Sequence, residues 1–400
     1  MLKKEALAAL LLLNLIVSSV SVLSSGNNQT WWNKEWSFNK EIYIPIDTSD
    51  ENTKFQPIDI QIDFENSCWA ENEKDHSIRV ILQDGETLKE LESQIYDLVY
   101  GDNDHITACN LVFLIPEEAN GMEKYYVYYD EEEKPSPGYQ DHVDVEESYY
   151  RYEPIPGYSF ESRYYKITED GYIVYAVAQE GECTGKGTTQ QATKLKTKTK
   201  EVMPQNGEVC ASFEFWYYYG QGIKEYSSTI EQLISKEIFV DGNLMVEFGI
   251  VSGTSREDMQ TSVIYKYYYC PTENKRLCTH VRHKTLQECN ISPGTNFDGV
   301  YTNLQCGGMK SNAIEELNFG EILPYLHVYA EPGILREYAL DPDPRYVPDD
   351  WNIRVLNTEH DVDLGDEAWA CFDKGETGVA HALILGSNSV VTSGTDERDG

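Results

Sequence analysis

Apolar and polar residues alternate along most of this chain, and this period of two constrains its fold more than any other feature of the sequence. Successive side chains of a β-strand point to opposite faces of the sheet, so alternation predicts strands with one buried face. The strand-like runs of the first third are residues 41–46, 58–64, 77–82, 111–115 and 124–129, with turn residues such as Asp84-Gly85 and Asn120-Gly121 between them. Their length and spacing predict an antiparallel β-sandwich over residues 31–130.

The strand pattern resumes after an acidic, proline-bearing break at residues 131–147, which we interpret as a linker. Asp241-Gly242 is typical of a two-residue hairpin, and only residues 228–235 and 312–317 look helical. Further strands are expected at residues 164–167, 172–178, 211–219, 236–240, 244–251, 261–269, 280–284, 321–329, 351–356, 367–372 and 380–385. We therefore expect an all-β chain with little helix. Residues 148–400 would form a larger β-sandwich or supersandwich domain, which we expect to be truncated at its C-terminus.

The first 25 residues have the parts of a secretory signal peptide. Lys3 and Lys4 precede a short apolar run, and small residues follow it at Ser24 and Ser25. The alternative is an uncleaved membrane anchor, which Asn14 in the apolar run disfavours. We therefore expect an extracellular or cell-surface protein, with no membrane insertion once the signal is cleaved.

The charge balance excludes some partners. The chain has 68 acidic and 32 basic residues, a net charge of −36, and such a surface repels nucleic acid. Disorder would explain a high charge, but an aromatic content of 12% argues against it. Calcium is the one cofactor that the carboxylates could bind, for example at residues 341–350 or 361–367, although neither has a complete calcium-loop pattern.

The chain has nine cysteines, which would mostly pair in an oxidising compartment. Cys68 with Cys109 is the first disulfide that we expect. Cys270, Cys278, Cys289 and Cys306 lie close in sequence, but their connectivity cannot be deduced from it. In a reducing compartment all nine would be free thiols.

Residues 31–130 resemble the N-terminal β-sandwich modules of secreted microbial proteins that precede polysaccharide-lyase or supersandwich domains. The resemblance is one of succession: Trp31, Trp32 and Trp36 lead into the first strand, residues 77–85 end in Asp-Gly, and residues 110–116 precede the tyrosine-rich strand 123–129. For the rest of the chain it implies a domain like galactose mutarotase and a carbohydrate ligand. A calcium-binding turn is part of the pattern, but residues 101–105 are a degenerate version of it.

Two aromatic clusters are candidates for carbohydrate binding. Sugar rings stack on exposed aromatic rings, and phenolic hydroxyls can orient them. The candidate residues are Trp216, Tyr217 and Tyr219 in the first cluster and Tyr267 and Tyr269 in the second. Alternatively, tyrosine is simply a favourable residue at half-buried strand positions.

A basic strand at residues 279–284 is the candidate for catalysis. On a strand, His280, Arg282 and Lys284 share one face, and His283 points to the other. A lyase or epimerase acting on uronic acids needs a cation for the carboxylate, a base and an acid, roles that Arg282, His280 and Tyr268 could supply. The alternative is a solvated strand face.

Alternating lysines at Lys194, Lys196, Lys198 and Lys200 allow a similar choice. They could bind an acidic sugar polymer, or they could protect an edge strand from aggregation, which we favour.

These observations favour a secreted or cell-surface protein that binds, or binds and processes, a polysaccharide or cell-surface glycan. The alternatives are a structural cell-envelope protein without catalysis, and a polysaccharide lyase or related carbohydrate-active enzyme. No sequence motif indicates an organic cofactor or a defined metal site.

Overall fold

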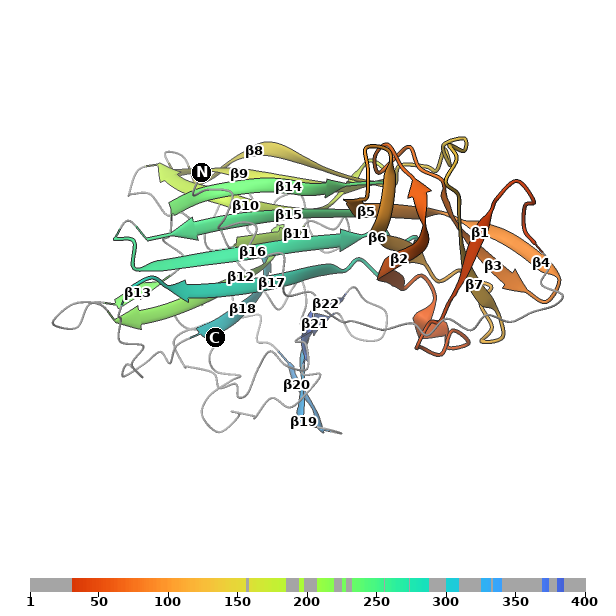
Figure 1. Cartoon of the computed structure of the whole chain (residues 1–400). Coiled ribbons are helices and arrows are strands. Elements are labelled where there is room, and N and C mark those ends of the chain that lie inside the picture. Colours follow the sequence, from red (N-terminus) through yellow and green to blue (C-terminus); the bar gives the residue numbers. More distant parts are fainter. Residues whose placement is uncertain are drawn as a thin grey trace. The chain divides into compact units, whose positions relative to one another are not determined.

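A computed structural model of the chain contains several antiparallel β-sheets (Figure 1). It describes residues 31–155, 158–184, 194–197, 207–218, 225–227, 232–254, 256–272, 274–287, 300–308, 325–331, 334–339, 369–373 and 380–384. Two compact units meet in sequence between Gln140 and Asp141. Among the described residues, no helix is long and apolar enough to cross a membrane.

The first unit contains two antiparallel sheets. One has the order β1-β7-β3-β4, formed by Phe38–Ile42, Lys124–Tyr129, Ile78–Asp84 and Thr87–Leu91. The other has the order β2-β6-β5, formed by Pro57–Trp69, His105–Leu114 and Ser93–Tyr100. A short 3₁₀ turn, η2 (Glu51–Thr53), begins after Asp50, whose carboxylate accepts a hydrogen bond from the backbone N–H of Asn52.

The core of this unit lies between its two sheets. Alternate residues of β3 and β7, among them Ile78, Val80 and Val127, pack against Ile95 and Leu111 of the second sheet. All five side chains are fully buried. This arrangement is a β-sandwich.

The outer face of the β1-β7-β3-β4 sheet is covered in part by the tryptophan-rich segment before β1. Trp36 packs against Ile81 and Tyr128, and Trp31 and Trp32 contact the Tyr128 ring edge-on. These tryptophans therefore contribute to a small second core.

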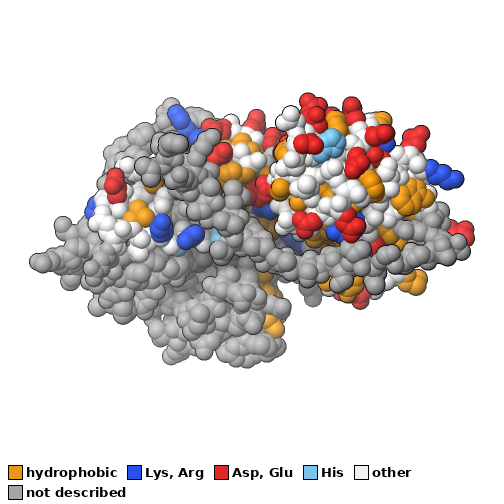
Figure 2. Space-filling view, viewed as in Figure 1, with side chains coloured by type: hydrophobic (Ala, Val, Ile, Leu, Met, Phe, Trp, Pro, Cys, Tyr) orange, Lys and Arg blue, Asp and Glu red, His pale blue; other side chains and the backbone are white. Residues whose placement is uncertain are grey.

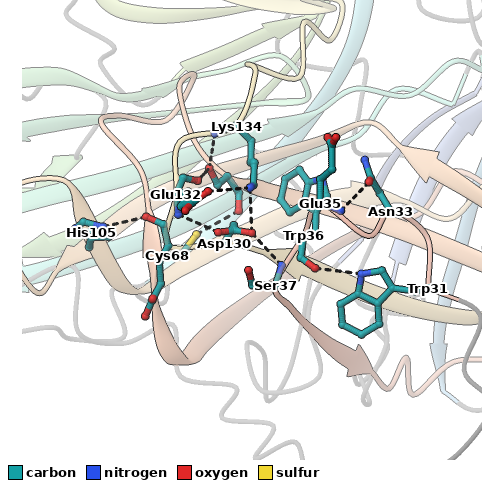
Figure 3. A network of polar contacts seen from close by, with 12 residues as sticks. Trp31, Asn33, Glu35, Trp36, Ser37, Cys68, His105, Asp130, Glu132 and Lys134 are labelled. Atoms are coloured by element: carbon teal, nitrogen blue, oxygen red, sulfur yellow. Dashed lines mark hydrogen bonds and ion pairs between the residues drawn. The ribbon is translucent and has the colours of Figure 1, made fainter.

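Asp130 ties that segment to the chain after β7 (Figure 3). Its carboxylate accepts hydrogen bonds from the backbone N–H groups of Ser37 and Glu132, both at 2.9 Å, and lies 3.2 Å from the Lys134 ammonium. Burial by itself would raise the pKa of Asp130, but these hydrogen bonds outweigh it and lower the pKa.

The second unit also contains a pair of large antiparallel sheets. One has the order β13-β12-β11-β10-β9-β8, with β18 also paired to β12. The other has the order β14-β15-β16-β17. The strands are β8 (Val143–Ile155), β9 (Tyr158–Glu169), β10 (Tyr172–Thr184), β11 (Lys194–Thr197), β12 (Gly207–Tyr218), β13 (Glu225–Ser227), β14 (Gln232–Asp241), β15 (Met245–Gly253), β16 (Met259–Tyr268), β17 (Leu277–Thr285) and β18 (Val300–Gly308).

The core of the second unit lies between these sheets. Val145, Tyr165 and Ile167 of the first sheet pack with Phe248 and Tyr265 of the second. A further sheet has the order β20-β19-β21-β22, formed by Ile334–Ala339, Tyr325–Glu331, Trp369–Asp373 and Ala380–Ile384. The expected all-β class is therefore confirmed.

Several local expectations need correction. Residues 232–235, expected to be helical, begin β14, where Leu233 packs against the core. Residues 143–147, interpreted as part of a linker, begin β8. Asp241 pairs with Val246, so the hairpin at Asp241-Gly242 has a connection longer than two residues. The expected helix at 312–317 and strand at 351–356 lie outside the described residues.

The lysine-rich segment is an interior strand and not an edge. β11 pairs with β10 on one side and β12 on the other, with Lys196 opposite Ala176 and Cys210. The proposed protection of a sheet edge is therefore wrong for Lys194 and Lys196. Lys198 and Lys200 lie outside the described residues.

The expected disulfide between Cys68 and Cys109 is absent, and both residues are buried free thiols. Cys68 lies opposite Ile106 on β6, whereas Cys109 lies three residues further along that strand, opposite Ile62. Three residues span about 10 Å of strand, more than the Cα separation that a disulfide allows. Cys289 lies outside the described residues.

Candidate functional site

β17 exposes a row of basic side chains at the edge of its sheet. His280, Arg282 and Lys284 are exposed, whereas Thr279, Val281 and His283, which alternate with them, are partly buried. Figure 2 shows blue basic side chains beside a pale blue histidine where Figure 1 places β17. No side-chain hydrogen bond or ion pair joins His280, Arg282 or Lys284 to another residue of the described chain. The shared face expected from the alternation is therefore present.

Tyr268 does not lie beside His280. His280 is opposite Ile264 of β16, and Tyr268 is four residues further along that strand. Four residues correspond to about 13 Å of strand, so His280 and Tyr268 cannot act on the same bond without a large rearrangement. His280 and Arg282, two residues apart on one face, are about 7 Å apart along the strand. The geometry thus keeps two of the three expected catalytic residues together.

Tyr267, expected to bind a ligand, points into the protein. Its ring is fully buried in the core of the second unit, and its hydroxyl donates a hydrogen bond to Glu169. The Lys275 ammonium contacts the other carboxylate oxygen of Glu169. Because successive side chains of a strand point to opposite faces, Tyr265, two residues before Tyr267, lies on the same buried face of β16.

Tyr269, the second residue of this cluster expected to bind a ligand, also contacts other residues of the protein. Its ring stacks on His142, with ring centroids 3.9 Å apart and planes 10° apart. Its backbone N–H donates to the Leu244 carbonyl at 2.8 Å. The rings of Tyr267 and Tyr269 therefore both pack against other residues of the protein.

The aromatic cluster on β12 is described only through its backbone. Trp216 lies opposite Ser227 of β13, and Tyr217 lies opposite Tyr226. The side chains of both residues, and the whole of Tyr219, lie outside the described part of the chain.

Two glycines of β15 lie on the outer face of the β14–β17 sheet, which is the face on which the basic side chains of β17 are exposed. A Cβ atom at Gly249 would meet the Phe239 ring at 2.7 Å, and one at Gly253 would meet Ile234 Cδ1 at 2.7 Å. Phe239 and Ile234 of β14 therefore lie across β15 where it has no side chain. Sequence reasoning missed these two residues, although glycine inside a strand is a signal for close approach.

The same face carries polar side chains between the apolar residues and the basic row. Lys266 and Glu247 form an ion pair of 2.8 Å, with 16% and 9% of their side chains exposed. Gln260 lies opposite Lys284, and Ser262 lies opposite Arg282. The face thus carries apolar residues together with Glu237 and Glu247 at β14 and β15, and basic residues at β17.

On the opposite face of β17, the partly buried histidine has a hydrogen-bond partner within the protein. The His283 ring nitrogen Nδ1 lies 2.9 Å from the Thr261 hydroxyl, and burial lowers the pKa of His283 to about 4. At neutral pH this histidine is therefore uncharged, and the positive charge of β17 belongs to its exposed face.

No group of three or more metal-ligating side chains is assembled among the described residues. In the turn at residues 101–105, Asp102 accepts hydrogen bonds from the Asp104 N–H at 3.1 Å and contacts His105 Nδ1 at 2.9 Å. The carboxylates at 341–350 and 361–367 lie outside the described residues.

Comparisons with known proteins give little beyond this. No family model and no curated protein matches the chain. Similar solved structures are an α-mannosidase from Enterococcus faecalis V583, with a TM-score of 0.34, and a protein of glycosyl hydrolase family 38 from Enterococcus faecalis, with a TM-score of 0.32. Both are 9% identical, and the alignments cover 85% and 87% of this chain. The chain spans 40% and 41% of those proteins, and similarity at this level carries no argument.

Proposed function

We propose that this chain is a carbohydrate-binding protein whose ligand lies on the outer face of the β14–β17 sheet. The observation that carries the proposal is the composition of this exposed face. Half-buried Phe239 and Tyr268 are positioned on it with the polar side chains of Gln260 and His280. Carbohydrate sites combine ring surfaces with a few hydrogen-bonding groups in this way.

A binding role fits the geometry better than a catalytic one. Tyr268, one of the expected catalytic residues, is about 13 Å along the strand from the position opposite His280. General acid–base catalysis needs groups within hydrogen-bond reach of one substrate bond. Binding has no such requirement, because an extended polymer can contact groups spread over a whole sheet face.

The test is retention on a panel of immobilised neutral and acidic polysaccharides, with the Tyr268→Ala variant. We expect a specific subset of glycans to retain the protein, and Tyr268→Ala to weaken that binding about 5- to 10-fold. Tyr43→Ala is the matched control, because Tyr43 is 75% exposed in the first unit and should leave retention unchanged. Retention by no glycan, with or without calcium, would contradict the proposal.

The same samples distinguish the two alternative functions. A polysaccharide lyase would generate an unsaturated product, detected by its ultraviolet absorbance, and a structural envelope protein would assemble into ordered arrays without retaining any glycan.

We also propose that the protein acts outside the cell after removal of residues 1–25. The charged start and short apolar run of this segment support export. Mass spectrometry of protein isolated from its native source should find a mature N-terminus near residue 26. An intact N-terminus in a cytoplasmic fraction would contradict export.

A further inference from the structure

We propose that the polysaccharide bound by this face carries carboxylate groups, and that Arg282 and Lys284 bind them, with His280 as the next contact along β17. This inference rests on the proposed function and specifies its ligand class. His280, Arg282 and Lys284 are exposed and lie at every second position of β17. They therefore form a row about 14 Å long with a repeat of about 7 Å.

A row of this kind matches a polymer with regularly spaced anionic groups. Arginine binds a carboxylate with two parallel hydrogen bonds, and lysine supplies a compact charge that adapts to its position. Neither Arg282 nor Lys284 is engaged by a described acidic residue, so a ligand would not first have to displace a partner from the described part of the chain.

The neighbouring charges on the sheet do not cancel this row. Glu247 on the same face is already paired with Lys266 at 2.8 Å. Glu237 lies on β14, three strands from β17 in the sheet order. Three strand spacings are about 14 Å, which exceeds the Debye length of about 8 Å at physiological ionic strength. The row is therefore locally basic, although the chain as a whole has a net charge of −36.

The net charge also favours a flexible, moderately charged ligand over a densely charged one. Duplex DNA carries one charge per about 1.7 Å and would meet the repulsion of the whole molecule along its length. A uronic acid polymer carries its charges further apart, and each could approach the basic row while the rest of the chain stays distant. The structure therefore favours a uronate polymer over a nucleic acid.

The experiment compares polygalacturonate with the same polymer after methyl esterification, which removes the charge and keeps the backbone. Wild-type protein should bind polygalacturonate at least 10-fold more tightly in 0.15 M salt. The Arg282→Gln/Lys284→Gln variant should lose most of this preference and retain its circular dichroism spectrum. Lys34→Gln/Lys74→Gln is the control, because it removes two exposed positive charges from the first unit and should change binding less than twofold.

The outcomes separate this inference from the proposed function. Equal binding of both polymers, weakened by Tyr268→Ala, would leave carbohydrate binding intact and overturn the carboxylate preference. Binding of neither polymer, when other glycans are retained, would also overturn it. Equal or tighter binding to dextran sulfate or to single-stranded DNA would show general attraction of polyanions and would contradict uronate recognition.

Discussion

His76 and His105 lie in the same unit, but their surroundings shift their pKa values in opposite directions. His76 is 1% exposed, and burial, followed by the charge of Arg79, lowers its pKa to about 3. His105 contacts Asp102 and the Glu131 carbonyl, at 2.9 Å and 3.1 Å, and the hydrogen bond to Asp102 raises its pKa.

The His76→Gln variant should be less sensitive to acid than the wild type. Below pH 6.5 the unfolded chain protonates His76 while the folded chain does not, so this residue costs about 1.4 kcal/mol of stability for each pH unit down to about 3. Urea unfolding of wild type and variant at pH 4 to 7.5 measures the difference. An unchanged dependence on pH would contradict burial of a neutral His76.

His105→Gln is the matched control with the opposite sign. A raised folded pKa gives stability that is fully present below the unfolded value of 6.5 and is lost as the pH rises through the folded value. His105→Gln should therefore reduce stability at pH 6 more than at pH 8. The partly exposed position of His105 makes this effect smaller than that of His76.

At the scale of elements, the β9–β10 hairpin depends on backbone conformation. Glu169 pairs with Tyr172, which leaves Asp170 and Gly171 as a two-residue turn. Both have positive φ, 47° and 81°, as a type I′ turn requires. Asp-Gly is a strong sequence signal for such a turn. The two-residue turn forms at Asp170-Gly171, whereas the connection at Asp241-Gly242 is longer.

Gly171→Ala should destabilise the protein by about 1 kcal/mol, because only glycine adopts this φ without strain. No atom lies within 4 Å of the added Cβ, so the cost is conformational and not a clash. Gly171→Asn should cost less, since asparagine tolerates this region better. Thermal unfolding of both variants checks the order, and an equal loss of stability would contradict it.

Gly249 gives the contrasting case within an element. Its φ is not positive, but a Cβ atom there would meet the Phe239 ring at 2.7 Å and 2.9 Å. The glycine is needed because a side chain from β14 occupies the space above β15. The period of two predicts β15 correctly, but it does not predict which neighbour covers the strand.

At the scale of the whole molecule, the chain has separate hydrophobic cores on the two sides of residue 140. The first core is built from β1 to β7 and the second from β8, β9, β10, β15 and β16. Arg79 connects several parts of the first unit. Its Nε lies 3.3 Å from a carboxylate oxygen of Glu90, its guanidinium carbon lies 5.2 Å from the centroid of the Trp36 ring, and it donates a hydrogen bond to the Pro135 carbonyl.

A fragment of residues 31–140 should therefore fold alone and unfold cooperatively, because all the core residues of the first unit lie within it. Its circular dichroism spectrum and urea transition give the measurement. A shorter fragment ending at residue 129 should be less stable, since it lacks Asp130, Lys134 and the Pro135 carbonyl. A fully unfolded 31–140 fragment would contradict this division.

The alternation of apolar and polar residues was enough to predict the all-β class and most strand positions, because it is a local property that follows from backbone geometry. It also determined that His280, Arg282 and Lys284 share a face. Tertiary structure decided the rest, because long-range pairing is not encoded in local spacing. It placed the lysine strand β11 inside a sheet, directed Tyr267 inward and separated Cys68 from Cys109. It also set Tyr268 apart from His280, since which residues lie opposite one another depends on strand register.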